Sequence, residues 1–149
     1  MSLCLVCLVV FLDQTSKFLV QKRLSLGESL PIIKDFFHLS LVYNRGIAFG
    51  MFKENLFFSI GVSLISIFII YRMLKEKTKE KIDLYLIALS LILGGALGNL
   101  IDRVLLGYVV DFLDFRIWPV FNLADSAISI GMIILGYLIF FKKDVSCNF

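Results

Sequence analysis

Four long apolar stretches most constrain what this chain can fold into. They cover residues 1–20, 56–74, 84–101 and 121–141, and a helix needs roughly 20 mostly apolar residues to cross a bilayer core about 30 Å thick. The 149 residues are 59% hydrophobic, with 15 phenylalanines and a mean hydropathy of +0.91, which is more than one soluble core requires. We therefore predict an all-α polytopic membrane protein with four transmembrane helices, in which residues 1–149 form a single membrane-embedded domain.

The first stretch is predicted to be a retained helix. It has neither a basic leading segment nor a small-x-small cleavage site, which are the marks of a removed signal peptide. Twelve residues would span only about 18 Å as a helix, so we expect the helix to continue through Asp13, Gln14 and Lys17.

Four spans place both termini on one side of the membrane. The loop RMLKEKTKEK carries five Lys/Arg in ten residues, and Lys142 and Lys143 follow the last span. The density of basic residues predicts that this side is cytoplasmic. The other side also totals seven Lys/Arg over longer segments, so a plain count does not decide the orientation.

The cysteines and the histidine give no pattern typical of a metal site or of a disulfide framework. Cys4 and Cys7 lie three residues apart in a predicted helix, Cys147 is at the far end, and His38 is the one histidine. Zinc sites and disulfide scaffolds need larger sets. We predict no metal and no cofactor, and we expect Cys4 and Cys7 to act as small buried hydrophobic side chains.

Two segments, 21–55 and 102–120, connect the spans on the other face. Within the first, FFHLSLVYN alternates apolar and polar residues and leads into NRGIAFG, whose two glycines permit a sharp turn. Within the second, GYVVDFLDF alternates and places Val109, Asp111, Leu113 and Phe115 on one side. Period-two alternation is typical of strands, so we predict a small sheet on the membrane surface.

Polar residues gather where the predicted helices reach this face. Asp13 and Lys17 are four apart and can pair on one side of a helix. Asn99, Asp102 and Arg103 follow the glycine-rich GGALG and, by their spacing, are expected to form one polar face. The glycines themselves indicate close helix packing. Packing needs no charge, so the three polar residues call for another explanation.

Asp111 and Asp125 are the two acids that most strongly suggest chemistry. Asn122 and Asp125 match a helix N-cap and its third residue, and capping alone could explain Asp125. If the two carboxyls meet in a low-dielectric site, they share one proton because two negative charges would repel. Such a pair can activate water and donate a hydrogen bond to the carbonyl under attack.

Two other classes of protein remain open at this level. Acids within membrane spans are also typical of proton-coupled transporters and channel subunits, although these acids gather at one face and the two halves of the chain do not match. A scaffold protein with capping carboxylates is the other alternative. It predicts that Asp111→Asn and Asp125→Asn leave function intact.

Five motifs in order resemble the lipoprotein signal peptidases of bacteria, also called signal peptidase II. They are DQTSK, NRGIAFG, GGALGNLIDRV, VVDF and FNLADSAI, and the resemblance extends from residue 13 to about residue 131. It implies four transmembrane helices, both termini in the cytoplasm, and a small β-cradle with a periplasmic helix on the outer membrane surface. The connection from Asp111 to Asp125 is short for this family, so details of the outer loop are not transferred.

The resemblance also implies an activity and a set of site residues. The family's enzymes are aspartic endopeptidases of the bacterial inner membrane that remove the signal peptide of a prolipoprotein just before a diacylglyceryl-modified cysteine. Expected partners are these prolipoproteins, membrane lipid and globomycin-type inhibitors, and no nucleic acid. The catalytic pair maps to Asp111 and Asp125. The supporting residues map to Asp13, Lys17, Asn44, Gly46, Ala48, Phe49, Asn99, Asp102, Arg103, Asn122 and Ala124.

Overall fold

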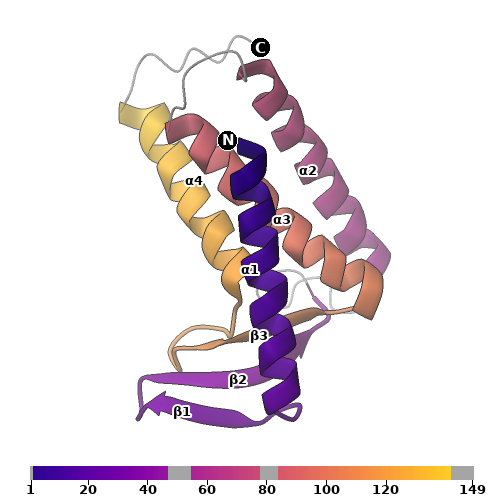
Figure 1. Cartoon of the computed structure of the whole chain (residues 1–149), viewed down its shortest axis with the longest axis vertical. Coiled ribbons are helices and arrows are strands. Elements are labelled where there is room, and N and C mark those ends of the chain that lie inside the picture. The colour runs from indigo at the N-terminus through magenta and orange to yellow at the C-terminus, as the bar shows by residue number, and fades with distance from the viewer. Residues whose placement is uncertain (1, 47–54, 78–83, 142–149) are drawn as a thin grey trace.

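The computed structural model describes residues 2–46, 55–77 and 84–141, which contain four long helices and a three-stranded sheet (Figure 1). The elements are α1 (Ser2–Arg23), β1 (Ser29–Ile33), β2 (Phe37–Asn44), α2 (Leu56–Lys77), α3 (Leu84–Leu106), β3 (Val109–Asp114) and α4 (Leu123–Phe141). All four helices are long and apolar enough to cross a membrane, which confirms the predicted class. The short outer-surface helix implied by the family resemblance is not among the described elements.

Helix α3 lies at the centre of the bundle and packs against α1, α2 and α4. Its glycines make this possible, as expected from the GGALG run. A Cβ on Gly94 would lie 2.8 Å from the Cβ of Val9 in α1, and a Cβ on Gly98 would lie 2.6 Å from a carboxylate oxygen of Asp13. Helix α2 touches α3 alone among the described elements and is mostly exposed, as befits a helix that faces lipid.

The sheet closes the end of the bundle where α1 ends and α4 begins, and its strands run across the helix axes (Figure 1). Its order is β1-β2-β3 with antiparallel pairing. The predicted strands in FFHLSLVYN and GYVVDFLDF are confirmed as β2 and β3. Alternation along β2 is interrupted because the register with β3 shifts between Leu39 and Val42. As a result Ser40 and Leu41 are both buried.

Strand β1 was not predicted from the sequence. All five of its residues are exposed, so it has no buried face that could produce alternation. Pro31 lies in this strand, and an edge strand is the place in a sheet where a missing backbone N–H is tolerated.

Several helix boundaries differ from the sequence expectations; α2, for example, continues to Lys77 and not only to residue 74. Helix α1 continues to Arg23 and α3 continues to Leu106, so Asp102 and Arg103 belong to a helix and not to the surface segment 102–120. Gly107, with φ +80°, ends α3. Helix α4 begins at Leu123 and not at residue 121, because Asn122 caps it.

Two further expectations concern the outside of the bundle. Cys4 and Cys7 are exposed on α1, so the expectation that they are buried is wrong: they lie on a side of the helix that no described element covers. The N-terminal end of α1 and the C-terminal end of α4 both lie away from the sheet (Figure 1). Both ends of the described chain are therefore on one side of the bundle, as four spans require.

Candidate active site

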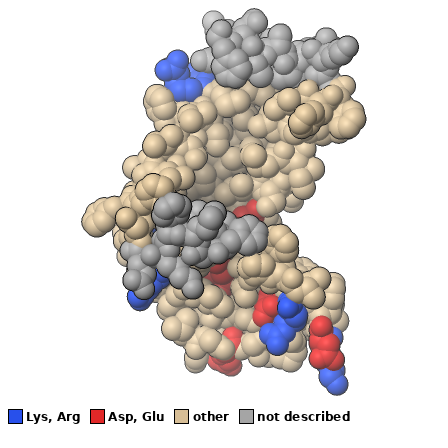
Figure 2. Space-filling view, turned by 180° about the vertical axis from the view of Figure 1, so that it is seen from behind, with Lys and Arg blue, Asp and Glu red and all other residues tan. Residues whose placement is uncertain are grey.

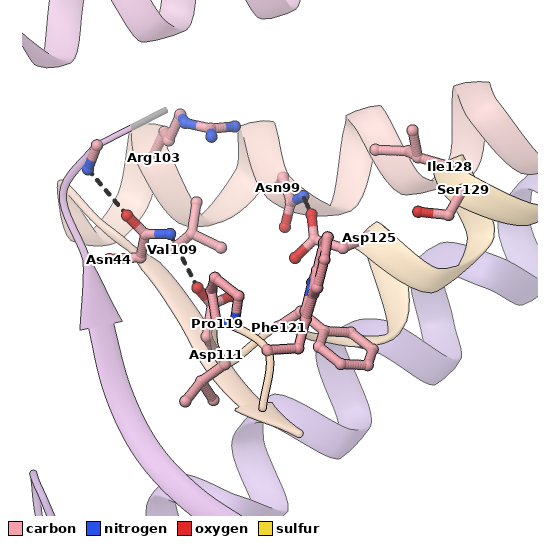
Figure 3. Close-up of a pocket in the computed structure, with 13 residues that line it drawn as sticks. Asn44, Asn99, Arg103, Val109, Asp111, Pro119, Phe121, Asp125, Ile128 and Ser129 are labelled. Carbon is pink, nitrogen blue, oxygen red and sulfur yellow. Dashed lines mark hydrogen bonds between the residues drawn. The ribbon is translucent and has the colours of Figure 1, made fainter. Parts of the chain in front are cut away.

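A cavity of about 330 Å³ lies between the sheet and the neighbouring ends of α3 and α4, and both Asp111 and Asp125 line it (Figure 3). The face of the molecule in Figure 2 is hollowed about halfway along its length, and atoms of acidic residues are visible in the hollow, below a largely uncharged part. The remaining lining residues are Asn44, Gly46, Asn99, Arg103, Val109, Trp118, Pro119, Val120, Phe121, Ile128 and Ser129.

Asp111 reaches the cavity from β3, in the centre of a buried strand. Its side chain is 2% exposed and accepts hydrogen bonds from Asn44 Nδ2 at 2.9 Å and from Asn122 Nδ2 at 2.7 Å. Burial, together with the negative charge of Asp125, raises the pKa of Asp111 to about 7, although both asparagine hydrogen bonds act in the opposite direction. Near neutral pH this carboxyl can therefore hold a proton.

Asp125 reaches the cavity from the first turn of α4. Its backbone N–H donates to Asn122 Oδ1 at 2.9 Å, and its own carboxylate accepts the Asn122 N–H at 3.3 Å. This reciprocal pair is a capping box, so the predicted cap formed by Asn122 and Asp125 is confirmed. The other carboxylate oxygen accepts Asn99 Nδ2 at 2.8 Å. Asp125 thus caps the helix and lines the cavity at once.

Two asparagines connect the aspartates through hydrogen bonds. Asn122 Nδ2 contacts Asp111 and also lies 3.1 Å from Asn99 Oδ1, while Asn99 Nδ2 donates to Asp125. The result is a continuous path from Asp111 through Asn122 and Asn99 to Asp125. Because both asparagines are almost fully buried, their amides hold the carboxylates in fixed orientations.

A buried charged cluster of Asp13, Lys17 and Asp102 lies directly behind Asn99. Lys17 Nζ is 2.8 Å from Asp13, 2.9 Å from Asp102 and 3.1 Å from Asn99 Oδ1. This confirms the predicted pairing of Asp13 with Lys17. All three charged side chains are at most 2% exposed, so their charges must be compensated within the cluster.

The same cluster fixes the two backbone segments that carry the aspartates. Asp13 accepts the N–H of Ala124 at 2.9 Å, and Asp102 accepts the N–H of Val110 at 3.0 Å. Ala124 directly precedes Asp125 and Val110 directly precedes Asp111. Asp13 of α1 and Asp102 of α3 therefore hold the residues that precede the two acids, and neither of them lines the cavity.

The residues of the expected polar face, Asn99, Asp102 and Arg103, have different partners, and Asn99 lies between the other two sets: Lys17 contacts Asn99 and Asp102, whereas Asn99 and Arg103 line the cavity. Asn99 and Arg103, one turn apart, line the cavity, and Arg103 Nη1 lies 3.4 Å from Ser63 Oγ on α2. Asp102 instead faces α1, where Lys17 and Gln14 bind it. Neighbouring residues on a helix differ by about 100° in direction, which is enough for Asp102 and Arg103 to face different partners.

The other expected site residues have the following places. Asn44 and Gly46 line the cavity, and Gly46 N–H donates to Asn44 Oδ1 at 3.0 Å. Asn122 and Ala124 are fully buried behind it. Ala48 and Phe49 lie outside the described residues. Among the described residues, no group of three or more His, Cys, Asp or Glu is placed to hold a metal ion.

Sequence reasoning missed several residues of the site. Gln14 donates to Asp102 at 2.9 Å and to the Gly98 carbonyl at 3.1 Å, and its position between Asp13 and Lys17 in DQTSK was the available signal. Ser129 lies four residues after Asp125, one helical turn further along the same face. Trp118 is in an irregular segment, where no periodicity could indicate its direction.

The fold and the cavity together define a membrane-embedded enzyme with a pair of carboxylates at one end of a four-helix bundle. The family model described as "Signal peptidase (SPase) II" matches residues 5–141. The chain belongs to the signal peptidase II family, which cleaves the signal peptides of prolipoproteins, and it is accordingly a peptidase. The transporter and scaffold alternatives are therefore wrong.

Similar proteins agree with this assignment over nearly the whole length. The lipoprotein signal peptidase of Caldanaerobacter subterraneus is 54% identical over 147 residues, covering 97% of this chain and 99% of that protein. The lipoprotein signal peptidase of Halothermothrix orenii is 52% identical, covering 87% and 88%. A solved bacterial membrane enzyme structure, 33% identical, superposes with a TM-score of 0.86 and covers 99% of this chain and 91% of that one.

Proposed function

We propose that Asp111 and Asp125 cleave the prolipoprotein by activating a water molecule between them. The observation that carries this proposal is that both carboxyls line one cavity and are joined by Asn122 and Asn99. Asp125, as a carboxylate, accepts a proton from water. Asp111, which holds a proton because its pKa is raised to about 7, donates a hydrogen bond to the scissile carbonyl.

The proton balance closes without a metal ion or a covalent intermediate. The water oxygen bonds to the carbonyl carbon while its proton moves to Asp125, and the carbonyl oxygen takes the Asp111 proton. When the tetrahedral intermediate collapses, the carbon–nitrogen bond breaks, the amine receives the proton from Asp125, and Asp111 recovers its own. The lining residue Arg103 is a fixed positive group beside the developing negative charge.

The substrate in this proposal is a prolipoprotein whose cysteine already bears diacylglycerol. A cavity at the end of a membrane bundle suits a scissile bond between an apolar signal helix and a lipid-modified residue. We further propose that globomycin-type inhibitors occupy the same cavity. We also propose that the protein lies in the bacterial inner membrane with both termini in the cytoplasm and the sheet on the outer side. The density of basic residues in the loop after α2 supports this orientation.

Purified protein in detergent tests this function directly. It should convert a diacylglyceryl-modified prolipoprotein to its mature form, seen as a mass shift on a gel, and leave the unmodified precursor uncut. Activity should survive EDTA, because two carboxylates and water are sufficient for the proposed chemistry. Loss of activity on chelation, restored by a divalent ion, would instead make Asp111 and Asp125 metal ligands.

A further inference from the structure

Ser129 differs from the other helical serines in its hydrogen bonding. Each of the others whose side chain is described donates to a backbone carbonyl three or four residues earlier, and these are Ser16, Ser59, Ser63, Ser66, Ser90 and Ser126. Such a bond satisfies a hydroxyl where water is scarce. Ser129 makes no hydrogen bond with any described residue, although the carbonyl of Asp125 lies one turn before it.

The side chain of Ser129 is exposed and lines the same cavity as the two aspartates. In Figure 3 its hydroxyl oxygen is directed toward the space beside Asp125. A hydroxyl in apolar surroundings without a partner costs free energy. A hydroxyl that points into this cavity and bonds to no described residue is therefore available to bind what enters it.

The depth of Ser129 indicates which part of a substrate it meets. Helix α4 runs away from the sheet (Figure 1), so Ser129 lies further into the bundle than Asp125 by four residues, which is about 6 Å at 1.5 Å per residue. An extended peptide advances about 3.3 Å per residue. A bound signal peptide enters from the membrane interior, so Ser129 lies beside the residue about two positions before the scissile bond.

A substrate must unwind at this point, because a carbonyl held in a helix is not open to attack by water. Unwinding within the membrane leaves backbone carbonyls without hydrogen-bond partners. We propose that the Ser129 hydroxyl donates a hydrogen bond to a backbone carbonyl of the signal peptide about two residues before the scissile bond. This inference rests on the proposed function, and it makes Ser129 a substrate-binding residue.

Steady-state kinetics with a synthetic diacylglyceryl lipopeptide test the inference. One neutral hydrogen bond corresponds to roughly two- to tenfold in binding, so Ser129→Ala should raise KM by about that factor. Its kcat should stay near the parental value, because the bond forms equally in the ground state and the transition state. Ser66→Ala is the matched control, since Ser66 bonds to Val62 on the exposed side of α2, and its KM should be parental.

A second substrate identifies the bond itself. Replacing the amide two residues before the cut by an ester weakens that carbonyl as an acceptor, so the change should raise KM for the parent enzyme. It should have little effect on Ser129→Ala, because the contact is already lost and the two changes are not additive. A parental KM for Ser129→Ala, or equal effects of the ester on both enzymes, would overturn the inference. Failure of the proposed two-aspartate mechanism would be seen in a different measurement, as a parental kcat of Asp111→Asn or Asp125→Asn.

Discussion

The orientation of the Asn99 amide is set by its neighbours on both sides. Its Oδ1 accepts from Lys17 and Asn122, so its Nδ2 is the end that remains to donate to Asp125. Lys17 has three donors, and they point to Asp13, Asp102 and Asn99. A residue of α1 that never touches the cavity thereby determines which atom faces a proposed catalytic carboxylate.

The raised pKa of Asp111 predicts how activity depends on pH. The proposed role of Asp111 requires its protonated form, which is present below a pKa of about 7 and is lost above it. The value of kcat/KM, which reports the free enzyme, should therefore fall above about pH 7 and approach a tenfold loss per pH unit. The measurement is kcat/KM between pH 5 and 9.

Asp114→Asn provides the matched control for this pH profile. Asp114 accepts hydrogen bonds from Ser40 and Arg116, which hold its pKa below the usual range, and it does not line the cavity. The profile of this variant should match that of the parent. A parental kcat/KM that stays constant up to pH 9 would mean that the proton on Asp111 is not needed.

Arg103→Lys tests whether the planar guanidinium matters. Arginine presents several donors in a fixed fork, whereas lysine offers one mobile ammonium. Hydrogen bonds of a charged donor correspond to about 1.5–3 kcal/mol, so the substitution should lower kcat/KM by roughly ten- to a hundredfold. Thermal stability in detergent should stay close to the parental value. If Arg103 merely extends to lipid headgroups, lysine serves equally well, and parental turnover would show it.

At the scale of elements, the glycines of α3 determine how close α1 and α4 can come. A Cβ on Gly95 would collide with the backbone carbonyl of Ala124 and lie 2.8 Å from Ile128 Cγ1. A rigid backbone atom cannot move away as a flexible side chain can. Because Ala124 directly precedes Asp125, this contact also determines where the acidic residue lies.

Gly95→Ala should therefore destabilise the protein. Overpacking a close contact typically costs about 1–3 kcal/mol, and the displaced start of α4 should also reduce activity. Gly136→Ala on α4 is the control, because a Cβ there meets nothing within 4 Å, and its melting temperature should be unchanged or slightly higher. Equal melting temperatures for both variants would mean that α3 and α4 can separate freely.

The sequence predicted those helices and strands that bury one face, and it did not predict the strand that buries none. The four spans, the strands β2 and β3 and the cap at Asn122 follow from hydropathy, alternation and capping chemistry. Strand β1 could not be predicted because it is exposed throughout. The side that Asp102 faces depends on where α1 packs, which is a tertiary contact that spacing along one helix does not contain.

At the scale of the whole molecule, the order of the motifs along the chain predicted that they lie close together. Consecutive membrane spans run in opposite directions, so the end of one span and the start of the next lie on the same side of the membrane. DQTSK lies in the second half of the first span, GNLIDR lies near the end of the third and FNLAD begins the fourth, so all three lie toward the same end of the bundle. Ser129 lay outside this reasoning, because we infer its role from the observation that it makes no hydrogen bond with a described residue. Other residues that line the cavity were found only in the structure, whereas Asp111 and Asp125 were expected from the sequence.

The turnover of purified Asp111→Asn and Asp125→Asn is the most direct test of the proposed aspartate pair. Asparagine keeps the size of the side chain, and at position 125 it can still accept the capping hydrogen bond through its side-chain oxygen, so folding should survive. Removing a general acid or base typically costs 10²- to 10⁴-fold. We predict a loss of kcat in this range for each variant, and most of the parental activity for Asp114→Asn. Near-parental turnover of either Asp111→Asn or Asp125→Asn would contradict the two-aspartate mechanism.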